Sequence, residues 1–166
     1  MKIIFISGSG AGAGKTTLAE KLTNGHHQVF SVANTIRFEI SKKYPKYDWY
    51  NKSTGYKNTT IVKETNMSLK QMMDKYGREK KEKNPLYWAK EMLNALDYAK
   101  DNEKLELAVI DDLRFVDEMK FIKSHFHNDA SCHFHIENPN AIPEPHYEND
   151  KLQECADYII NINFKK

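Results

Sequence analysis

The first 17 residues read MKIIFISGSGAGAGKTT. A short apolar run, Ile3 to Ile6, leads into a glycine-rich turn that ends at Gly14-Lys15-Thr16. Apolar residues then recur at helical spacing from Leu18 onward. This order of strand, glycine-rich loop and helix is that of a phosphate-binding P-loop. We therefore expect the phosphates of a nucleotide to bind where the first strand ends.

Each residue type in this loop has a chemical reason. Glycine lets backbone N–H groups approach phosphate oxygens, and the helix N-terminus adds partial positive charge. Lys15 can reach the β- and γ-phosphates of ATP, and Thr16 can hold Mg2+, or Thr17 in its place. The residues predicted to bind the nucleotide are Gly10, Gly12, Ala13, Gly14, Lys15, Thr16 and Thr17.

The loop departs from the strict motif at one position. In the pattern G-x-x-x-x-G-K-[ST], the first glycine falls where this chain has Ser9. Either Ser9 replaces that glycine, or Gly8 takes its part in a loop that is one residue longer. The alternative without a ligand is a flexible glycine-rich turn.

The composition is that of one folded domain with a sizeable core, because 40% of the 166 residues are hydrophobic and 29% are charged. The net charge of +2 gives no indication of a nucleic-acid partner, and we expect none. The two cysteines, Cys132 and Cys155, fit a reducing compartment. We see neither a signal peptide nor an apolar run near the ~18 residues of a membrane span. A cytoplasmic protein without a membrane partner is therefore expected.

Five strand-like stretches separated by helical patterns predict an α/β fold with a parallel five-stranded sheet in three layers. The later strands are expected at 28–33, 105–110, 131–136 and 158–162. Ligands of such sheets bind at the carboxyl ends of the strands, which here carry residues 8–16, 31–37, 111–114 and 138–150. Ser68 to Gln71 has the form of a capping box and predicts a helix that continues to Lys83. Residues 45–60 are aromatic and irregular, which is typical of an insertion over a substrate or of a surface loop with packed aromatics.

Three stretches together resemble the deoxynucleoside monophosphate kinases of viral type, which belong to the P-loop nucleoside monophosphate kinase fold. They are Gly14 to Thr17, Met72 to Trp88 with its Gly77, and Ile110 to Phe115. The resemblance covers the chain from residue 1 to about residue 163. It implies one kinase domain, 1–166, with an acceptor-binding insertion at about 34–83 and a lid at about 138–150.

The resemblance also implies a chemistry. The cofactors would be ATP and Mg2+, the acceptor a (deoxy)nucleoside monophosphate, and the location the host cytoplasm if the chain is viral. Lys15, Asp112 and Arg114 would be catalytic, with Thr16 and Asp112 as Mg2+ ligands, Asp112 through water, and Asp111 as a second candidate for that role. The acceptor would be bound by Arg37, Lys57, Arg78, Lys81, Asp112 and Arg114.

Two alternatives stay open. Tyr56-Lys57, residues 77–81 and residues 112–114 also resemble animal phosphomevalonate kinases, although aromatic residues at 44–56 would suit stacking on a base. Relatives often carry a lid arginine before a proline, where this chain has Asn138. A nucleotide-binding regulatory protein that has lost catalysis is therefore the alternative from another class. Relatives are often dimers, and a homodimer is left open here.

Overall fold

Parallel strands and helices alternate along the chain, which divides into two units. The structure is a computed structural model that describes residues 1–23, 29–51, 53–126, 131–144 and 147–163. Met1–Ser31 and Ala89–Lys166 form one unit, here called the core unit. Val32–Trp88 forms the other, the helical unit, which contains the range predicted as the acceptor-binding insertion. Within the described ranges, no helix is long and apolar enough to cross a membrane.

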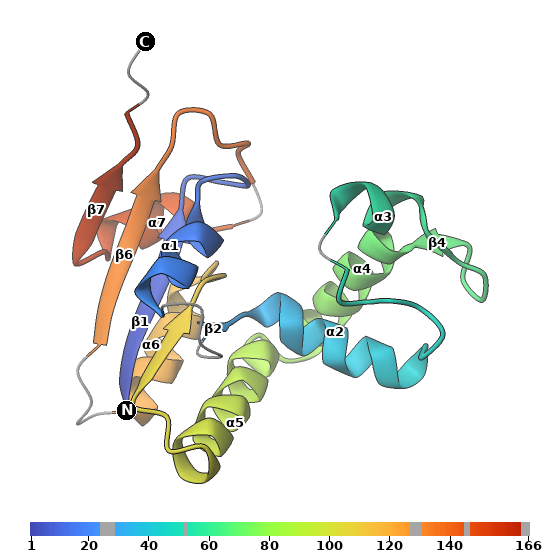
Figure 1. The fold of residues 1–166 in the computed structure, drawn as a ribbon, viewed down its shortest axis with the longest axis horizontal. Helices are drawn as coiled ribbons and strands as arrows, with labels where there is room; N and C mark the ends of the chain where they lie inside the picture. The colour runs from blue at the N-terminus through green and yellow to red at the C-terminus, as the bar shows by residue number, and fades with distance from the viewer. Residues whose placement is uncertain (24–28, 52, 127–130, 145–146, 164–166) are drawn as a thin grey trace. The chain divides into compact units, whose positions relative to one another are not determined.

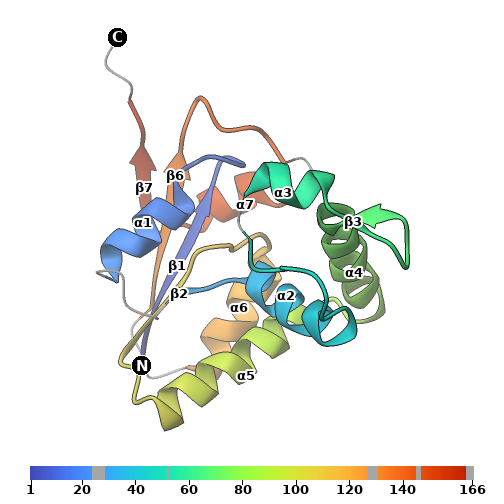
Figure 2. The same ribbon diagram turned by 45° about the vertical axis from the view of Figure 1, so that its right-hand side comes forward.

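The core unit is built on a five-stranded sheet in which all strands are parallel, with the order β2-β5-β1-β6-β7. Its strands are β1 (Lys2–Gly8), β2 (Val29–Phe30), β5 (Leu107–Ile110), β6 (Ser131–Glu137) and β7 (Tyr158–Asn161). The helices that flank it are α1 (Lys15–Leu22), α6 (Val116–His125) and α7 (Asn149–Glu154), together with most of α5 (Tyr87–Asn102). In both views α1 lies on one face of the sheet, and α6 and α7 lie on the other (Figure 1, Figure 2). The predicted parallel five-stranded α/β sheet is confirmed.

The central strand explains why this sheet needs helices on both faces. Ile3, Phe5 and Ile6 of β1 are almost completely buried, and so are Val109 and Ile110 of the neighbouring β5. A strand with apolar side chains on both of its faces is stable only when both faces are covered. The predicted strand 28–33 is shorter in the structure, because the helix α2 (Val32–Lys43) already begins at Val32.

The strand order creates a switch point between β1 and β5. From the end of β1 the chain crosses towards β2, whereas from the end of β5 it crosses in the opposite direction towards β6. Ligands of open α/β sheets bind at such a point, beyond the carboxyl ends of the two strands. The segments that leave β1 and β5 there are residues 9–14 and 111–115, which contain most of the predicted site residues of the core unit.

The helical unit has a core of its own. Besides α2, it contains α3 (Thr54–Thr59), the hairpin β3 (Ile61–Val62) and β4 (Met67–Ser68), and α4 (Leu69–Lys83). Its buried hydrophobic cluster consists of Ile40, Trp49, Val62, Leu69, Met72 and Met73. The predicted capping box is confirmed: Ser68 accepts from the Gln71 backbone, and the Gln71 side chain accepts from the Ser68 backbone. The irregular stretch 45–60 ends in a short helix, α3, that was not predicted.

Gly77 has a packing role within the helical unit. A Cβ at this position would lie 3.0 Å from Cδ1 of Ile36 in α2, so a side chain there would require the end of the Ile36 side chain to shift. The Gly77 carbonyl oxygen accepts a hydrogen bond of 2.9 Å from Nε1 of Trp88. These two residues belong to the stretch that resembles a kinase family, and internal packing already explains both.

Candidate functional site

The glycine-rich loop, residues 8–14, connects β1 to α1 at the switch point. Gly12 and Gly14 have φ angles of +80° and +102°, in the left-handed region that favours glycine. Gly14 is the N-cap of α1, and it makes no side-chain hydrogen bond to the first helical turn. The N–H groups of that turn have no partners within the helix itself, so the loop and the start of α1 together favour an anion.

Ser9 occupies its place in the loop without backbone strain. Among the residues that the structure describes, the non-glycines with a positive φ are Asn66 and Lys104, and Ser9 is not one of them. The backbone of β6 comes close to Gly8 instead: a Cβ at Gly8 would lie 3.0 Å from the Ile136 carbonyl oxygen. A serine is therefore compatible with the position where the strict motif has its first glycine.

Lys15 is folded back over the loop. Its Nζ donates a hydrogen bond of 2.8 Å to the carbonyl oxygen of Gly10. Burial lowers the pKa of Lys15, while the carboxylates of Asp112 and Glu144 act in the opposite direction. A phosphate bound at this amine would supply the charged partner that best offsets its burial.

Thr16 and Asp111 connect the start of α1 to the end of β5. The Thr16 hydroxyl donates a hydrogen bond of 3.0 Å to Oδ2 of Asp111, a buried residue. The Asp111 backbone N–H donates to the carbonyl oxygen of Phe30, so Asp111 extends the pairing of β5 with β2. A hydroxyl and a carboxylate this close are hard oxygen donors, the kind that Mg2+ prefers, and the pair fits that ion.

Asp112 contacts Arg114 rather than Thr16. Oδ1 of Asp112 accepts a hydrogen bond of 2.7 Å from Nε of Arg114. The guanidinium of Arg114 lies 4.2 Å from the centre of the Tyr147 ring, a distance suited to a cation–π contact. The structure therefore pairs Asp112 with Arg114, whose charges both act on Lys15, and it places Asp111 beside Thr16.

The predicted lid, 138–150, consists of two different parts. Residues 138–144, here called the strap, run beside the glycine-rich loop (Figure 1), whereas α7 begins at Asn149. Ala11 and Ile142 exchange two backbone hydrogen bonds of 2.9 and 2.8 Å. Residues 145 and 146 lie outside the described residues. The strap is thus bonded to the loop whose phosphate contacts were predicted.

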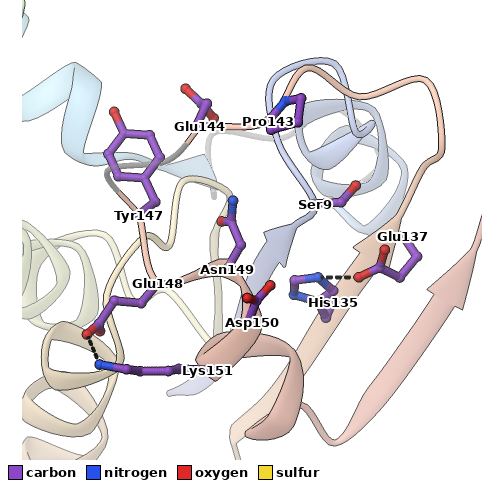
Figure 3. Close-up of a pocket in the computed structure, with 10 residues that line it drawn as sticks. All are labelled: Ser9, His135, Glu137, Pro143, Glu144, Tyr147, Glu148, Asn149, Asp150 and Lys151. Carbon is purple, nitrogen blue, oxygen red and sulfur yellow. Dashed lines mark hydrogen bonds and ion pairs between the residues drawn. The ribbon is translucent and has the colours of Figure 1, made fainter.

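A cavity of about 550 Å3 opens next to Ser9, below the strap and beside α7 (Figure 3). Its lining includes the carboxylates of Glu137, Glu144, Glu148 and Asp150. Among the described residues of the lining, Lys151 is the one lysine, so negative charge is in excess and the cavity is a poor place for a phosphate group. The open N–H groups at the start of α1, rather than this cavity, are where an anion is expected.

A buried polar chain runs beneath the loop, from the core to the cavity. The Ser7 hydroxyl lies 2.8 Å from Nε2 of His133 and 2.7 Å from Nδ1 of His135. Nε2 of His135 lies 2.9 Å from Oε1 of Glu137 (Figure 3). Both imidazoles are almost fully buried. Their clustering in the sequence reflects this chain of contacts, and within the described residues no group of three such side chains could hold a metal ion.

Because His133 is buried, we expect the folded protein to lose stability in acid. Burial lowers its pKa from 6.5 to about 4, so the unfolded chain takes up a proton at a higher pH than the folded one. The stabilisation by neutral His133 is therefore present above about pH 6.5 and lost as the pH falls towards 4, on the order of 3 kcal/mol. In His133→Gln, we expect the free energy of unfolding, measured with urea, to lose this part of its pH dependence.

The same substitution at His125, which is exposed at the end of α6, is the control. It should lower the free energy of unfolding less than His133→Gln does, because the His125 side chain is exposed and the His133 side chain is buried. Equal pH dependence of His133→Gln and the wild type would contradict the assignment to His133.

Two predicted acceptor-binding residues lie close together in the helical unit. Arg37 is buried on α2, where its Nη1 donates a hydrogen bond of 2.6 Å to Oδ1 of Asn34. Burial lowers the pKa of Lys57, and the nearby charges of Arg37 and Lys70 lower it further. Cations that repel each other in this way make a place where a bound anion would be stabilised.

Arg78 and Lys81 lie further along α4. Lys70, which influences Lys57, lies at the start of that helix, and Arg78 and Lys81 follow about two and three turns later. Their neighbour Lys80 has a defined structural role, because its Nζ lies 3.0 Å from the Tyr87 hydroxyl and 3.5 Å from the Glu39 carboxylate. The charges of Arg37 and Lys70 both act on Lys57, which groups these three cations in the helical unit.

The aromatic residues expected to stack on a base have packing roles. Trp49 is buried, its Nε1 donates to the carbonyl oxygen of Tyr44, and the rings of Tyr44 and Tyr47 lie within 6.4 Å of its own. Tyr50, in contrast, is 53% exposed. The aromatic content of residues 44–56 is thus largely explained by the core of the helical unit.

Comparison with known proteins bears on the fold. No family model matches the sequence, and no curated protein matches it either. The structure is similar to the crystal structure of TT1252 from Thermus thermophilus, with a TM-score of 0.52 and 13% sequence identity, over 98% of this chain and 89% of that one. At this identity, the similarity concerns the fold alone.

Proposed function

We propose that this chain is a P-loop kinase that transfers the γ-phosphate of ATP to a phosphorylated small molecule, with a (deoxy)nucleoside monophosphate as the preferred acceptor. One observation supports this most: Thr16 is hydrogen-bonded to Asp111 at the end of β5, next to Lys15, which begins α1 and bonds back to the glycine-rich loop. A hydroxyl, a carboxylate and an amine at one switch point are the groups that hold a nucleotide triphosphate and its metal.

Each group of the chain has a task in this reaction. The N–H groups at the start of α1 hold phosphate oxygens, and Lys15 leaves Gly10 to bind the β- and γ-phosphates. An oxygen of the acceptor's phosphate attacks the γ-phosphorus while the bond to the β-phosphate oxygen breaks, and ADP leaves. Arg114, held by Asp112, balances the charge of the acceptor.

Thr16 and Asp111 would hold Mg2+, which supplies positive charge to the phosphate oxygens when it is bound. Replacing Asp111 with asparagine is expected to lower kcat by about 100-fold or more and to abolish the gain in ATP affinity that Mg2+ gives. The reason is that the Asp111 carboxylate, which accepts the hydrogen bond of the Thr16 hydroxyl, would be the charged ligand of the ion. Isothermal titration of a non-hydrolysable ATP analogue with and without Mg2+ measures the second effect.

Asp112→Asn is the matched control for that prediction. Because Asp112 is bonded to Arg114, its loss should raise the KM for the acceptor and leave the effect of Mg2+ on ATP affinity intact. The reverse result, with Mg2+ dependence lost only in Asp112→Asn, would assign the metal to Asp112, as the sequence first indicated.

The acceptor is expected to carry a phosphate, because the neighbouring cations Arg37 and Lys57 suit a dianion. Phosphomevalonate is the second candidate for the acceptor. Because Trp49 is buried, it does not offer its ring to a base, and the aromatic residues then favour a nucleotide acceptor less. The decisive test is ADP release measured by a coupled assay with each NMP, each dNMP and phosphomevalonate. ATP binding without turnover on any of them would instead support a regulatory nucleotide-binding protein.

A further inference from the structure

The two positions at which the chain departs from the kinase pattern are in contact with each other. Ser9, in place of the first glycine, accepts a hydrogen bond of 3.0 Å from the backbone N–H of Asn138 through its Oγ. The same hydroxyl donates to the Asn138 carbonyl oxygen at 3.3 Å. A glycine at position 9 would remove both bonds, so the serine has a function that the strict motif lacks.

The side chain of Asn138 extends this contact to the next part of the loop. Its Nδ2 donates a hydrogen bond of 3.2 Å to the carbonyl oxygen of Gly12. Its Oδ1 accepts from the backbone N–H of Asn140 at 2.9 Å, which fixes the turn at the start of the strap. Because a peptide unit is planar, holding the Gly12 carbonyl also fixes the orientation of the Gly12–Ala13 peptide.

The backbone bonds between Ala11 and Ile142 complete the attachment. The strap passes so close to the loop that a Cβ at Gly10 would lie 2.1 Å from the Ile142 carbonyl oxygen. The bonds of Ser9, Ala11 and Gly12 to the strap thus follow one another along the loop. The Gly12 carbonyl oxygen lies 3.2 Å from Nδ2 of Asn138 on the strap. The peptide units that follow Gly12 lead into α1.

We infer that Ser9 and Asn138 are positioning residues that attach the strap to the glycine-rich loop and hold the loop in its phosphate-binding form. The inference rests on the proposed function, because it assigns a purpose to the loop. Neither residue takes part in the chemistry. A loop that is already ordered loses less conformational entropy when the nucleotide binds, so its affinity is higher.

The most specific test is a substitution that restores the strict motif, because the motif alone would suggest that it improves nucleotide binding. Ser9→Gly restores the strict pattern, yet we expect it to weaken ADP binding by about fivefold to tenfold, and Ser9→Ala to do the same. Asn138→Ala should have an effect of similar size through Gly12. In the double variant, the losses should combine to less than their product, because both residues hold the same strap. Ser9→Thr, which keeps the hydroxyl, should recover most of the affinity.

Two further readouts separate positioning from general stability. The KM for ATP should rise in Ser9→Ala and Asn138→Ala, whereas the KM for the acceptor should stay as in the wild type. Amide hydrogen exchange at Ala11 and Ile142, measured without nucleotide, should become faster in both variants, since these two N–H groups bond across the loop and the strap.

The outcomes are distinguishable. If the wild type binds ADP and Ser9→Gly binds it equally well or better, the inference is overturned and the proposed function stands. Unchanged exchange at Ala11 and Ile142 in Ser9→Ala would also overturn the inference alone. If the wild type binds neither ADP nor ATP, the proposed function fails and the inference fails with it.

Discussion

Replacing Lys15 with methionine is expected to lower ATP-dependent phosphoryl transfer by about 100- to 1,000-fold, while the protein stays folded. Methionine keeps the length of the side chain and removes only the charge that would neutralise the transferred phosphate. In the protein without ligand, Lys15 makes a hydrogen bond to one backbone carbonyl, and burial already opposes its charge. Its loss should therefore change the free energy of unfolding by less than about 1 kcal/mol.

The control is Lys21→Met at the other end of the same helix. Lys21 is exposed in the last turn of α1, where a cation contributes a few tenths of a kcal/mol through the helix dipole. We expect it to retain full activity. Steady-state kinetics together with thermal unfolding of both variants separates a catalytic defect from a folding defect. Full activity of Lys15→Met with every acceptor would rule out the P-loop mechanism.

Replacing Gly10 with alanine is expected to have the largest effect on stability. The new Cβ would lie 2.1 Å from the carbonyl oxygen of Ile142 and 2.7 Å from its carbon, and a backbone group cannot give way as a flexible side chain can. Either the strap or the loop must move, and the two bonds between Ala11 and Ile142 are then lost. We expect the free energy of unfolding to fall by about 2–3 kcal/mol, measured with urea.

The matched control for that substitution is Gly55→Ala in α3. There the nearest atom to an added Cβ is Oγ of Ser53 at 3.8 Å, an ordinary contact. Alanine also favours helix, so this variant should be equal to the wild type or more stable by up to about 1 kcal/mol. A Gly10→Ala variant as stable as Gly55→Ala would mean that the strap does not lie on the loop in solution.

Local patterns were sufficient for the elements that depend on near neighbours. The strand and helix around the glycine-rich loop and the capping box at Ser68 were predictable, because their signals are apolar spacing and capping chemistry within a few residues. The hairpin of β3 and β4 was missed, since each strand is only two residues long. The aromatic content of residues 44–56 suited either base stacking or a loop with packed aromatics. The structure buries Trp49 against Tyr44 and Tyr47, a tertiary contact that composition does not reveal.

The candidate site shows where sequence reasoning ends. Successive residues of a strand point to opposite faces, so the choice between Asp111 and Asp112 depends on whether β5 stops at Ile110 or its pairing continues for one more residue. The bond from the Asp111 N–H to Phe30 decides this, and it joins segments far apart in the chain. The contact of Ser7 with His133 spans 126 positions and has no local signal either.

The buried chain of Ser7, His133, His135 and Glu137 has a direction, because a hydroxyl carries a single proton. While Glu137 is ionised it can only accept, so Nε2 of a neutral His135 donates to it and Nδ1 must accept from Ser7. The Ser7 oxygen then accepts from Nε2 of His133. The tautomer of His133, deep in the sheet, thus depends on the charge of a carboxylate at the cavity wall as well as on the backbone hydrogen bond of His133 to Cys155. Neutralising that carboxylate would allow every proton in the chain to reverse its direction together.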